Sequence, residues 1–295
     1  MKPNSFVLTL LLSAALSIAA AFFVGAYLSS GTQLAPRTIE SRLEQVKRTG
    51  VLRCGYTVDP PFLTKDANAG KLGGPFYELA EEIGRQLKLK IEWAGEAGPG
   101  QMLTDLASNR YDMICSPYSE TPGRAREADF TNPVFYWSVY LYVRKDDRRF
   151  DENRERANKP DIKFAALDGH YSTIAVDENF PSAGKVSLPE LSSAIDLFMM
   201  VATKKADAVI ADPYTFADYA AANPDVLRPA GGKPLRLIAD GLPIPANEPA
   251  LKAMINTTLA YLHDSGFIDK TLKKYDAPIK LIRVAKPYSE EGTAP

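Results

Sequence analysis

The 295-residue chain has few of the side chains that build metal centres and disulfide scaffolds. It contains two cysteines, Cys54 and Cys115, and two histidines, His170 and His263. Residues this few and this scattered have neither the spacing of a structural zinc site nor the density of a disulfide-stapled domain. We therefore expect no metal and no other cofactor.

An excess of charge of one sign is also missing. The sequence has 35 basic and 36 acidic residues, a net charge of −1. Without a basic footprint, nucleic acid is excluded as a partner. With 45% hydrophobic and 24% charged residues, the composition is that of a globular protein long enough for two domains.

Charge is absent altogether from residues 6–28, FVLTLLLSAALSIAAAFFVGAYL, which follow Lys2. This run is longer than the apolar core of a signal peptide, roughly 7 to 15 residues, and long enough for a spanning helix of about 20. Ala19, Ala20 and Ala21 offer a small-residue cleavage site. Residues 1–30 are thus either a signal peptide or an uncleaved anchor in the cytoplasmic membrane, and both predict an exported, periplasmic protein.

The rest of the chain shows two series of alternating helices and short apolar strands, which predicts a parallel α/β sheet in each. The stretches ASNRYDMICSP (107–117) and ATKKADAVIADP (202–213) are alike, which indicates two similar lobes. The charged run 144–161 is expected to be a solvated loop or exposed helix between them. The expected helices are 41–47, 76–88, 102–108 and 190–205, and the expected strands are 51–56, 90–93, 111–115, 163–167, 185–188 and 207–211.

Polar and aromatic side chains gather after the predicted strands. Ligands of open parallel sheets bind outside the carboxyl ends of the strands, so these positions are candidates for a binding site. They are Asp59, Phe62, Ser116, Tyr118, Ser119, Thr121, Gly169, His170, Tyr171, Asp212 and Tyr214.

The segment SETPGRAREADF (119–130) raises a question about Arg124. Thr121 followed by Pro122 predicts a helix start, with Thr121 as its N-cap. Arg124 would then lie beside free backbone N–H groups, and together they would form a pocket for a carboxylate. The alternative is an ordinary surface ion pair of Arg124 with Glu127 or Asp129.

Several segments together resemble one family, from about Ser41 to Asp276. It is the amino-acid-binding branch (family 3) of the periplasmic solute-binding proteins of ABC importers. The segments are GYTVDPPF, GKLGGPFYELAEEIGRQL, LASNRYDMICSPYSETPGRAREADFTNPVF, KKADAVIADPYTFADYAAANP and INTTLAYLHDSGFIDKTLKKY.

This resemblance implies the type II periplasmic-binding fold, in which two α/β lobes joined by two crossing strands close on a ligand. The crossings are expected at WSVYLYV and near ADGLP. Lobe 1 is then residues 38–137 and 242–282, lobe 2 is residues 138–241, and residues 283–295 are a C-terminal tail.

The resemblance also implies roles for single residues. Arg124, assisted by Ser119, would hold the carboxylate of an amino acid, and Asp212 would hold its ammonium group. Thr121, Asp59 and Phe62 are expected near Arg124, with Tyr118, His170, Tyr171 and Tyr214 as further neighbours. No residue is assigned as catalytic or metal-binding.

The chain departs from the family around the ligand side chain. GEAGPGQ (95–101) has no aromatic residue where the family usually has one, Asp59 replaces another aromatic residue, and Gly169-His170-Tyr171 replaces Gly-Thr-Thr. The identity of the amino acid is therefore left open.

Two pairs of residues have alternative interpretations. The resemblance places the strands of Cys54 and Cys115 side by side, so a disulfide is one alternative, but we favour unpaired thiols in the core. Tyr136 and Trp137 are expected to pack within a crossing strand instead of forming a platform for the ligand.

Three functions fit these observations. The leading hypothesis is a carrier that delivers an α-amino acid to an ABC importer. The second is a cyclohexadienyl dehydratase, whose general acid would be Asp59, Glu120 or His170. The third is a sensory or accessory ectodomain, if residues 6–28 remain as an anchor.

Overall fold

The computed structural model describes residues 17–24, 40–190, 192–231, 233–275 and 282–283. Residues 17–24 form a helix, and no helix within these ranges is long and apolar enough to cross a membrane. The remainder of the proposed signal peptide or anchor, 1–16 and 25–30, lies outside the described residues. So do residues 284–295 of the predicted tail.

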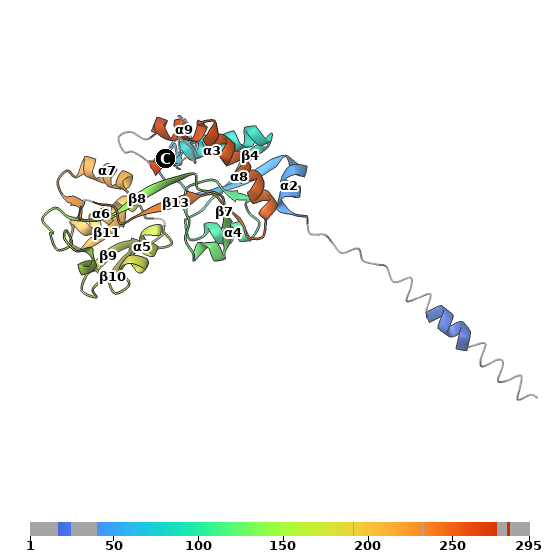
Figure 1. Cartoon of the computed structure of the whole chain (residues 1–295), viewed down its shortest axis with the longest axis horizontal. Helices are drawn as coiled ribbons and strands as arrows, with labels where there is room; N and C mark the ends of the chain where they lie inside the picture. Colours follow the sequence, from blue (N-terminus) through green and yellow to red (C-terminus); the bar gives the residue numbers. More distant parts are fainter. Residues whose placement is uncertain (1–16, 25–39, 191, 232, 276–281, 284–295) are drawn as a thin grey trace, which may run out of the picture. The chain divides into compact units, whose positions relative to one another are not determined.

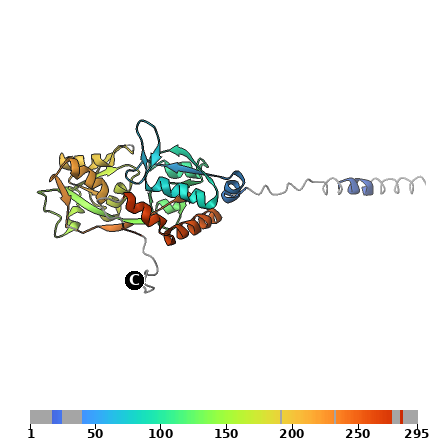
Figure 2. The ribbon, with the colours of Figure 1, turned by 90° about the horizontal axis from the view of Figure 1, so that it is seen from above.

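Lobe 1 is built on the parallel sheet β4-β1-β5, as the alternating pattern predicts. Its first helix begins with a capping box, in which Ser41 and Glu44 each accept a backbone N–H of the other. Helices α3, α8 and α9 pack together on this lobe (Figures 1 and 2). Its elements are α2 (Arg42–Thr49), β1 (Val51–Tyr56), β2 (Thr64–Lys65), β3 (Leu72–Gly73), α3 (Pro75–Leu87), β4 (Lys90–Glu96), α4 (Met102–Ala107), β5 (Met113–Ile114), β6 (Tyr118–Ser119), the 3-10 turn η1 (Arg124–Arg126), β7 (Ala128–Phe130), β14 (Pro243–Pro245), α8 (Pro249–Asp264) and α9 (Phe267–Tyr275).

Lobe 2 has a second parallel arrangement, β10-β9-β11. An aromatic cluster packs on it, with Tyr142 stacked on Phe216 at 4.2 Å between ring centroids and Phe198 stacked on Tyr219 at 5.3 Å. Its elements are the 3-10 turn η2 (Arg154–Ala157), β9 (Lys163–Leu167), α5 (Tyr171–Asn179), β10 (Gly184–Leu188), α6 (Ala194–Ala202), β11 (Ala208–Ala211), α7 (Pro213–Ala222) and β12 (Leu227–Pro229). In the charged run 144–161, Arg144 ends strand β8 and the rest is loop apart from η2.

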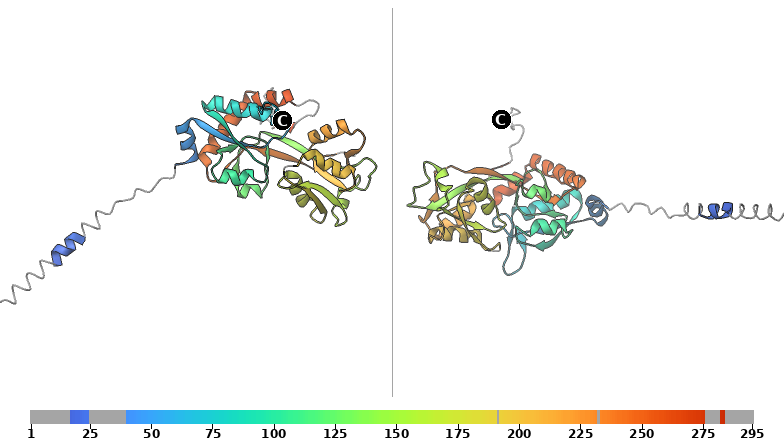
Figure 3. Two further views of the ribbon diagram at one scale, coloured as in Figure 1. Left: turned by 180° about the vertical axis from the view of Figure 1, so that it is seen from behind. Right: turned by 90° about the horizontal axis from the view of Figure 1, so that it is seen from below.

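Two antiparallel strands, β8 (Phe135–Arg144) and β13 (Arg236–Gly241), run between the lobes (Figures 1 and 3). The first half of β8 pairs with β13 and its second half with β11, so one long strand belongs to both lobes. This is the predicted fold class. The part from Ser41 onward forms one compact unit, so the exact residue limits of the lobes stay predictions. The short strand β15 (Ile282–Arg283) pairs with β8. Ile282 is the predicted last residue of lobe 1, and Arg283 lies one residue beyond it.

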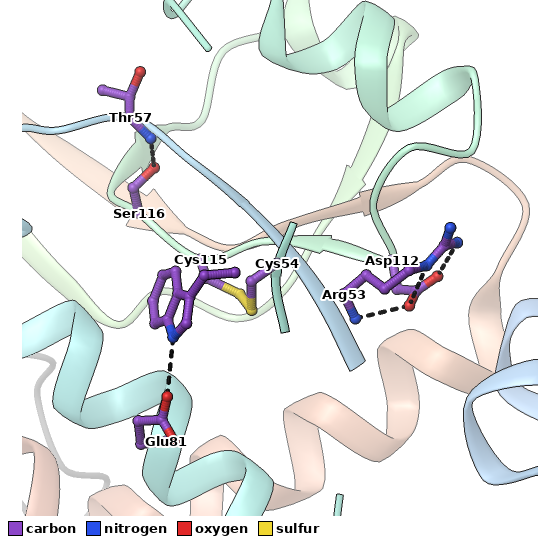
Figure 4. Close-up of a disulfide and its surroundings, with 8 residues drawn as sticks. Arg53, Cys54, Thr57, Glu81, Asp112, Cys115 and Ser116 are labelled. Carbon is purple, nitrogen blue, oxygen red and sulfur yellow. Dashed lines mark hydrogen bonds and ion pairs between the residues drawn. A yellow bond between two sulfur atoms is a disulfide. The ribbon is translucent and has the colours of Figure 1, made fainter. Parts of the chain in front are cut away.

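The expectation of unpaired thiols is wrong, because Cys54 and Cys115 form a disulfide (Figure 4). Strands β1 and β5 are adjacent and parallel, with Cys54 opposite Met113. This pairing brings the two cysteine Cα atoms to 5.4 Å, within the range that a disulfide spans. The bridge lies beside the ion pair of Arg53 and Asp112.

The helix predicted after Thr121 is also wrong. The segment makes only the three-residue turn η1 and then enters β7, which pairs with β14. Thr121 Oγ1 does accept the backbone N–H of Arg124 at 3.3 Å, as a cap would. The pairing of β7 with β14 takes up the backbone that the helix needed, so Arg124 lies in a short 3-10 turn and not in the first turn of an α-helix.

Candidate functional site

A cavity of about 720 Å³ lies between the lobes and receives side chains from both. Nine of the ten predicted site residues line it: Asp59, Phe62, Tyr118, Ser119, Arg124, His170, Tyr171, Asp212 and Tyr214. Thr121 is the exception. It lines a separate hollow of about 410 Å³ together with Glu120 and Lys252, so it supports the backbone at Arg124 from behind.

Arg124 is a buried cation whose nearest partners are neutral. Its guanidinium donates to the backbone oxygens of Ser119 at 2.9 Å and Gly169 at 3.1 Å, and it stacks on the Tyr118 ring at 4.1 Å. Among the described residues, no carboxylate lies within ion-pair distance of it, so the surface pair with Glu127 or Asp129 does not form. A buried guanidinium with this surrounding is available to an anion in the cavity.

Asp212 is held in lobe 2 as the N-cap of α7. Its two carboxylate oxygens accept the backbone N–H of Thr215 at 2.7 Å and the Thr215 hydroxyl at 2.8 Å. Burial raises the pKa of Asp212, while these hydrogen bonds lower it. The cap orients the carboxylate at the cavity wall, where it can still accept from a cationic group.

Asp59 and Asp240 bring two more carboxyl groups to the same cavity. Asp59 sits in a tight turn after β1, in which its backbone oxygen accepts from Phe62 and Leu63. Burial, with the charges of Asp212 and Asp240, raises the pKa of Asp59 to about 7. Burial likewise raises the pKa of Asp240 to about 6, against the opposing effects of Trp137, Ser119 and Arg124.

His170 lines the cavity and also caps a helix. It is the N-cap of α5, where Nδ1 accepts the backbone N–H of Ser172 at 3.2 Å, and it also lines the cavity. Burial and the nearby charge of Arg124 lower the pKa of His170 to about 4. The ring is therefore neutral near pH 7.

The sequence analysis missed several residues of this cavity, among them Trp137, Asp240 and Glu190. Trp137 was expected to pack within β8, but it lines the cavity and meets the Tyr171 ring edge-on at 5.6 Å. Asp240 lies in the ADGLP segment that marks the second crossing. A polar residue in an apolar crossing strand was a usable signal for it.

Glu190 connects the lobes at the edge of the cavity. From lobe 2, its Oε1 accepts the backbone N–H of Gly100 at 2.5 Å, at the start of α4 in lobe 1. Nearby, Gly169 has a φ of +70°, and a Cβ built on it would come within 2.9 Å of the Gly100 nitrogen. Glycine is thus required at 169 both by its backbone conformation and by the close approach of the lobes.

Comparison with known proteins identifies the family. Residues 52–277 match the model of the bacterial extracellular solute-binding proteins, family 3, and the chain belongs to that family.

Two curated relatives align with most of the chain. A probable histidine-binding protein of Campylobacter jejuni is 26% identical over 211 residues, which are 70% of this chain and 77% of the relative. A cyclohexadienyl dehydratase of Pseudomonas aeruginosa is 21% identical over 237 residues, 80% of this chain and 86% of the relative.

Solved structures agree on the fold. An ancestral amino acid-binding protein, a precursor of cyclohexadienyl dehydratase, has a TM-score of 0.66 and 27% identity and covers 80% of this chain and 99% of its own. An ancestral arginine-binding protein bound to arginine has a TM-score of 0.64 and 23% identity, covering 77% and 98%.

Proposed function

We propose that this chain, a member of the family 3 solute-binding proteins, captures an α-amino acid outside the cytoplasmic membrane and delivers it to an ABC importer. The observation that supports this most is the placement of two opposite charges in one cavity. Arg124 comes from lobe 1 and Asp212 from lobe 2. A zwitterion bound between them would neutralise both and hold the lobes together.

The energetics favour an anion at Arg124. Its guanidinium is buried and its protein partners are carbonyl oxygens, which supply partial charge but no counter-charge. A carboxylate would accept two parallel hydrogen bonds from it, and charge-assisted bonds of this kind are about twice as strong as neutral ones. Asp212 would accept from the ammonium group without losing its cap.

The comparisons support the same ligand class and the transport role. The relative in Campylobacter jejuni is described as histidine-binding, and a relative in Haemophilus influenzae is described as a probable amino-acid ABC transporter-binding protein. The disulfide between Cys54 and Cys115 favours an oxidising, extracytoplasmic location. Whether residues 6–28 are cleaved or kept as an anchor is decided by determining the N-terminus of the exported protein.

A thermal-shift screen of the purified protein against the twenty common amino acids tests this function. A ligand at 100 times its Kd stabilises the folded state by about 2.7 kcal/mol, so a binder raises the melting temperature. The matched controls are the amide and the N-acetyl derivative of each binder, which lack one of the two charges. Equal shifts for these derivatives, or no shift with any amino acid, would contradict the proposal.

A dehydratase is the second candidate, because Asp59 is a half-buried carboxyl group that lines the cavity and has a pKa raised to about 7. Such a group holds a proton near neutral pH and is suited to general-acid catalysis. The relative in Pseudomonas aeruginosa is a cyclohexadienyl dehydratase. Incubation with prephenate tests this candidate, and formation of phenylpyruvate that is lost in Asp59→Asn would support it.

A further inference from the structure

The cavity contains more negative charge than a simple amino acid can neutralise. Its lining includes six acidic residues against Arg124, and the low pKa of His170 leaves that ring uncharged. A zwitterion brings one charge of each sign, so it leaves this surplus unchanged. The acidic residues are Asp59, Glu96, Glu190, Asp212, Asp218 and Asp240.

Four of the six acidic residues are accounted for by their surroundings. Glu190 accepts the backbone N–H of Gly100, and Asp212 accepts hydrogen bonds from Thr215. Glu96 forms an ion pair with Lys65 at 2.7 Å, and Asp218 is exposed to solvent.

Asp59 and Asp240 remain. Among the described residues, neither has a cation within ion-pair distance, although Asp240 is only 3% exposed. Asp240 Oδ1, Trp137 Nε1 and Tyr171 Oη make no hydrogen bond of normal geometry within the described residues. Trp137 and Ser119 nonetheless lie close enough to Asp240 to lower the pKa of its carboxyl group, so Asp240 has polar neighbours but no ion-pair partner. All three atoms belong to residues that line the cavity.

Buried polar groups are almost always hydrogen-bonded, and buried charges are almost always paired. Two of the three unpartnered atoms, Asp240 Oδ1 and Tyr171 Oη, can accept a hydrogen bond from a ligand group, whereas Trp137 Nε1 is a donor and needs an acceptor. Together with the unpaired carboxyl group of Asp59, these two acceptors favour a positively charged donor in this part of the cavity. The unsatisfied carboxylate oxygen requires a donor. Asp59, Asp212 and Asp240 line the same cavity, and the charges of the other two raise the pKa of Asp59. A cation would relieve this mutual repulsion.

We propose that the ligand is an α-amino acid with a second positive charge on its side chain, such as lysine or arginine, and that Asp59 and Asp240 bind this charge. The inference rests on the proposed function, because Arg124 and Asp212 are taken to hold the α-carboxylate and α-ammonium groups. Asp59 is then the residue that selects among amino acids, at the position where the family usually has an aromatic residue.

Calorimetry of the purified protein at pH 8 tests the inference with matched ligand pairs. L-lysine is compared with L-norleucine, which lacks only the ε-amino group, and L-arginine with L-citrulline, which lacks only the charge. We expect the cationic member of each pair to bind tighter by roughly 30-fold to a few thousand-fold.

Variants assign the effect to residues. Asp59→Asn and Asp240→Asn should each weaken lysine binding by at least about tenfold and leave norleucine nearly unchanged, which also shows that the variants are folded. Asp218→Asn is the matched control, since the same charge is removed at an exposed edge of the cavity, and it should change lysine binding by less than about fivefold.

The outcomes separate this inference from the proposed function. Equal binding of lysine and norleucine overturns the inference and leaves amino-acid capture intact. A preference for lysine that persists in the double variant Asp59→Asn/Asp240→Asn also overturns it. Cadaverine, which is lysine without its α-carboxylate, should bind far more weakly than lysine, and equal binding would overturn the amino-acid function itself.

Discussion

The carboxyl ends of β5 and β11 face one cavity from the two lobes and offer a direct comparison. The stretches before them, 107–117 and 202–213, are similar in sequence, and the structure shows that they are similar in detail. Each preceding helix ends near a residue with positive φ, Asn109 at 66° and Lys204 at 63°.

The Asp of each stretch makes the same two hydrogen bonds to the neighbouring strand. Asp112 accepts the backbone N–H of Arg53 at 2.8 Å and donates its own to Arg53 O, next to β5. Asp207 makes the same two contacts with Lys163, next to β11. Each Asp therefore fixes the register of its strand against the neighbouring parallel strand.

After the strands, the two lobes differ. Pro213 starts α7, so Asp212 is held by a helix cap. The chain after Pro117 enters β6 instead, and Arg124 arrives in a 3-10 turn, held by stacking on Tyr118. The similar stretches before β5 and β11 therefore determine where the two strands end. The different connections after them determine that lobe 1 places Arg124 in the cavity and lobe 2 places Asp212 there.

The largest expected effect comes from removing the cation of lobe 1. Arg124→Ala should weaken ligand binding roughly 30-fold to a few thousand-fold, because a buried charge pair that loses one partner costs about 2 to 5 kcal/mol. Calorimetry measures this. Arg126→Ala is the control, since Arg126 is exposed in the same turn and should contribute about 0 to 1 kcal/mol. Equal losses in both variants would refute the assignment of Arg124.

Among the residues that the structure describes, the disulfide of Cys54 and Cys115 cross-links lobe 1 and not lobe 2. Replacing Cys54 and Cys115 together by Ala should lower the free energy of unfolding by about 2 to 4 kcal/mol, because the bridge closes a loop across 61 positions. Urea unfolding with and without reductant measures the loss. A wild-type protein unaffected by reductant, and a variant of unchanged stability, would show that the bridge does not form in solution.

Asp59 is expected to lower the free energy of unfolding at high pH, although we propose that it strengthens ligand binding. Its pKa is raised from 3.8 to about 7 in the folded protein, so the folded state holds a proton that the unfolded state has released between these values. The contribution of Asp59 to unfolding free energy therefore falls as pH rises from 4 to 7. Asp59→Asn should be more stable than the wild type by about 1 to 3 kcal/mol at pH 8 and equal to it at pH 4.

Urea unfolding of both proteins without ligand at the two pH values measures this difference. Subtracting wild type from variant cancels the groups whose titration does not depend on Asp59. Asp212 and Asp240 interact with Asp59, so the measured difference also includes the change in their own titration. A variant that is less stable than the wild type at pH 8 would mean that Asp59 has a cationic partner in solution.

The smallest effect tests the cap in lobe 2. Thr215→Val keeps the backbone N–H bonded to Asp212 and removes only the hydroxyl at 2.8 Å. The hydroxyl acts on the ligand only through Asp212, which keeps its backbone hydrogen bond, so its loss should weaken ligand binding by about 0.5 to 1.5 kcal/mol, the net value of a typical hydrogen bond, which calorimetry resolves. A loss as large as that of Arg124→Ala would mean that Thr215 itself contacts the ligand.

Much of the fold could be predicted because local patterns and packing agree. Strands β1 and β9 appear at the expected residues, 51–56 and 163–167, since both are short apolar runs bounded by turn residues. The prediction of a helix after Thr121 was wrong, although the capping hydrogen bond from Arg124 N–H to Thr121 Oγ1 does form. The pairing of β7 with β14 overrode this local preference, and in it Phe130 lies opposite Pro243, 113 positions further along the chain.

The sequence by itself determined the alternation of helices and strands, the two similar lobes and the strand ends where the charges stand, because periodicity and turn residues act over a few neighbours. Only the tertiary structure decided the disulfide, the buried contacts of Arg124 and the meeting of Asp59 with Asp240. These depend on residues far apart in the chain, and their burial and charge interactions arise only once the crossing strands bring both lobes to one cavity.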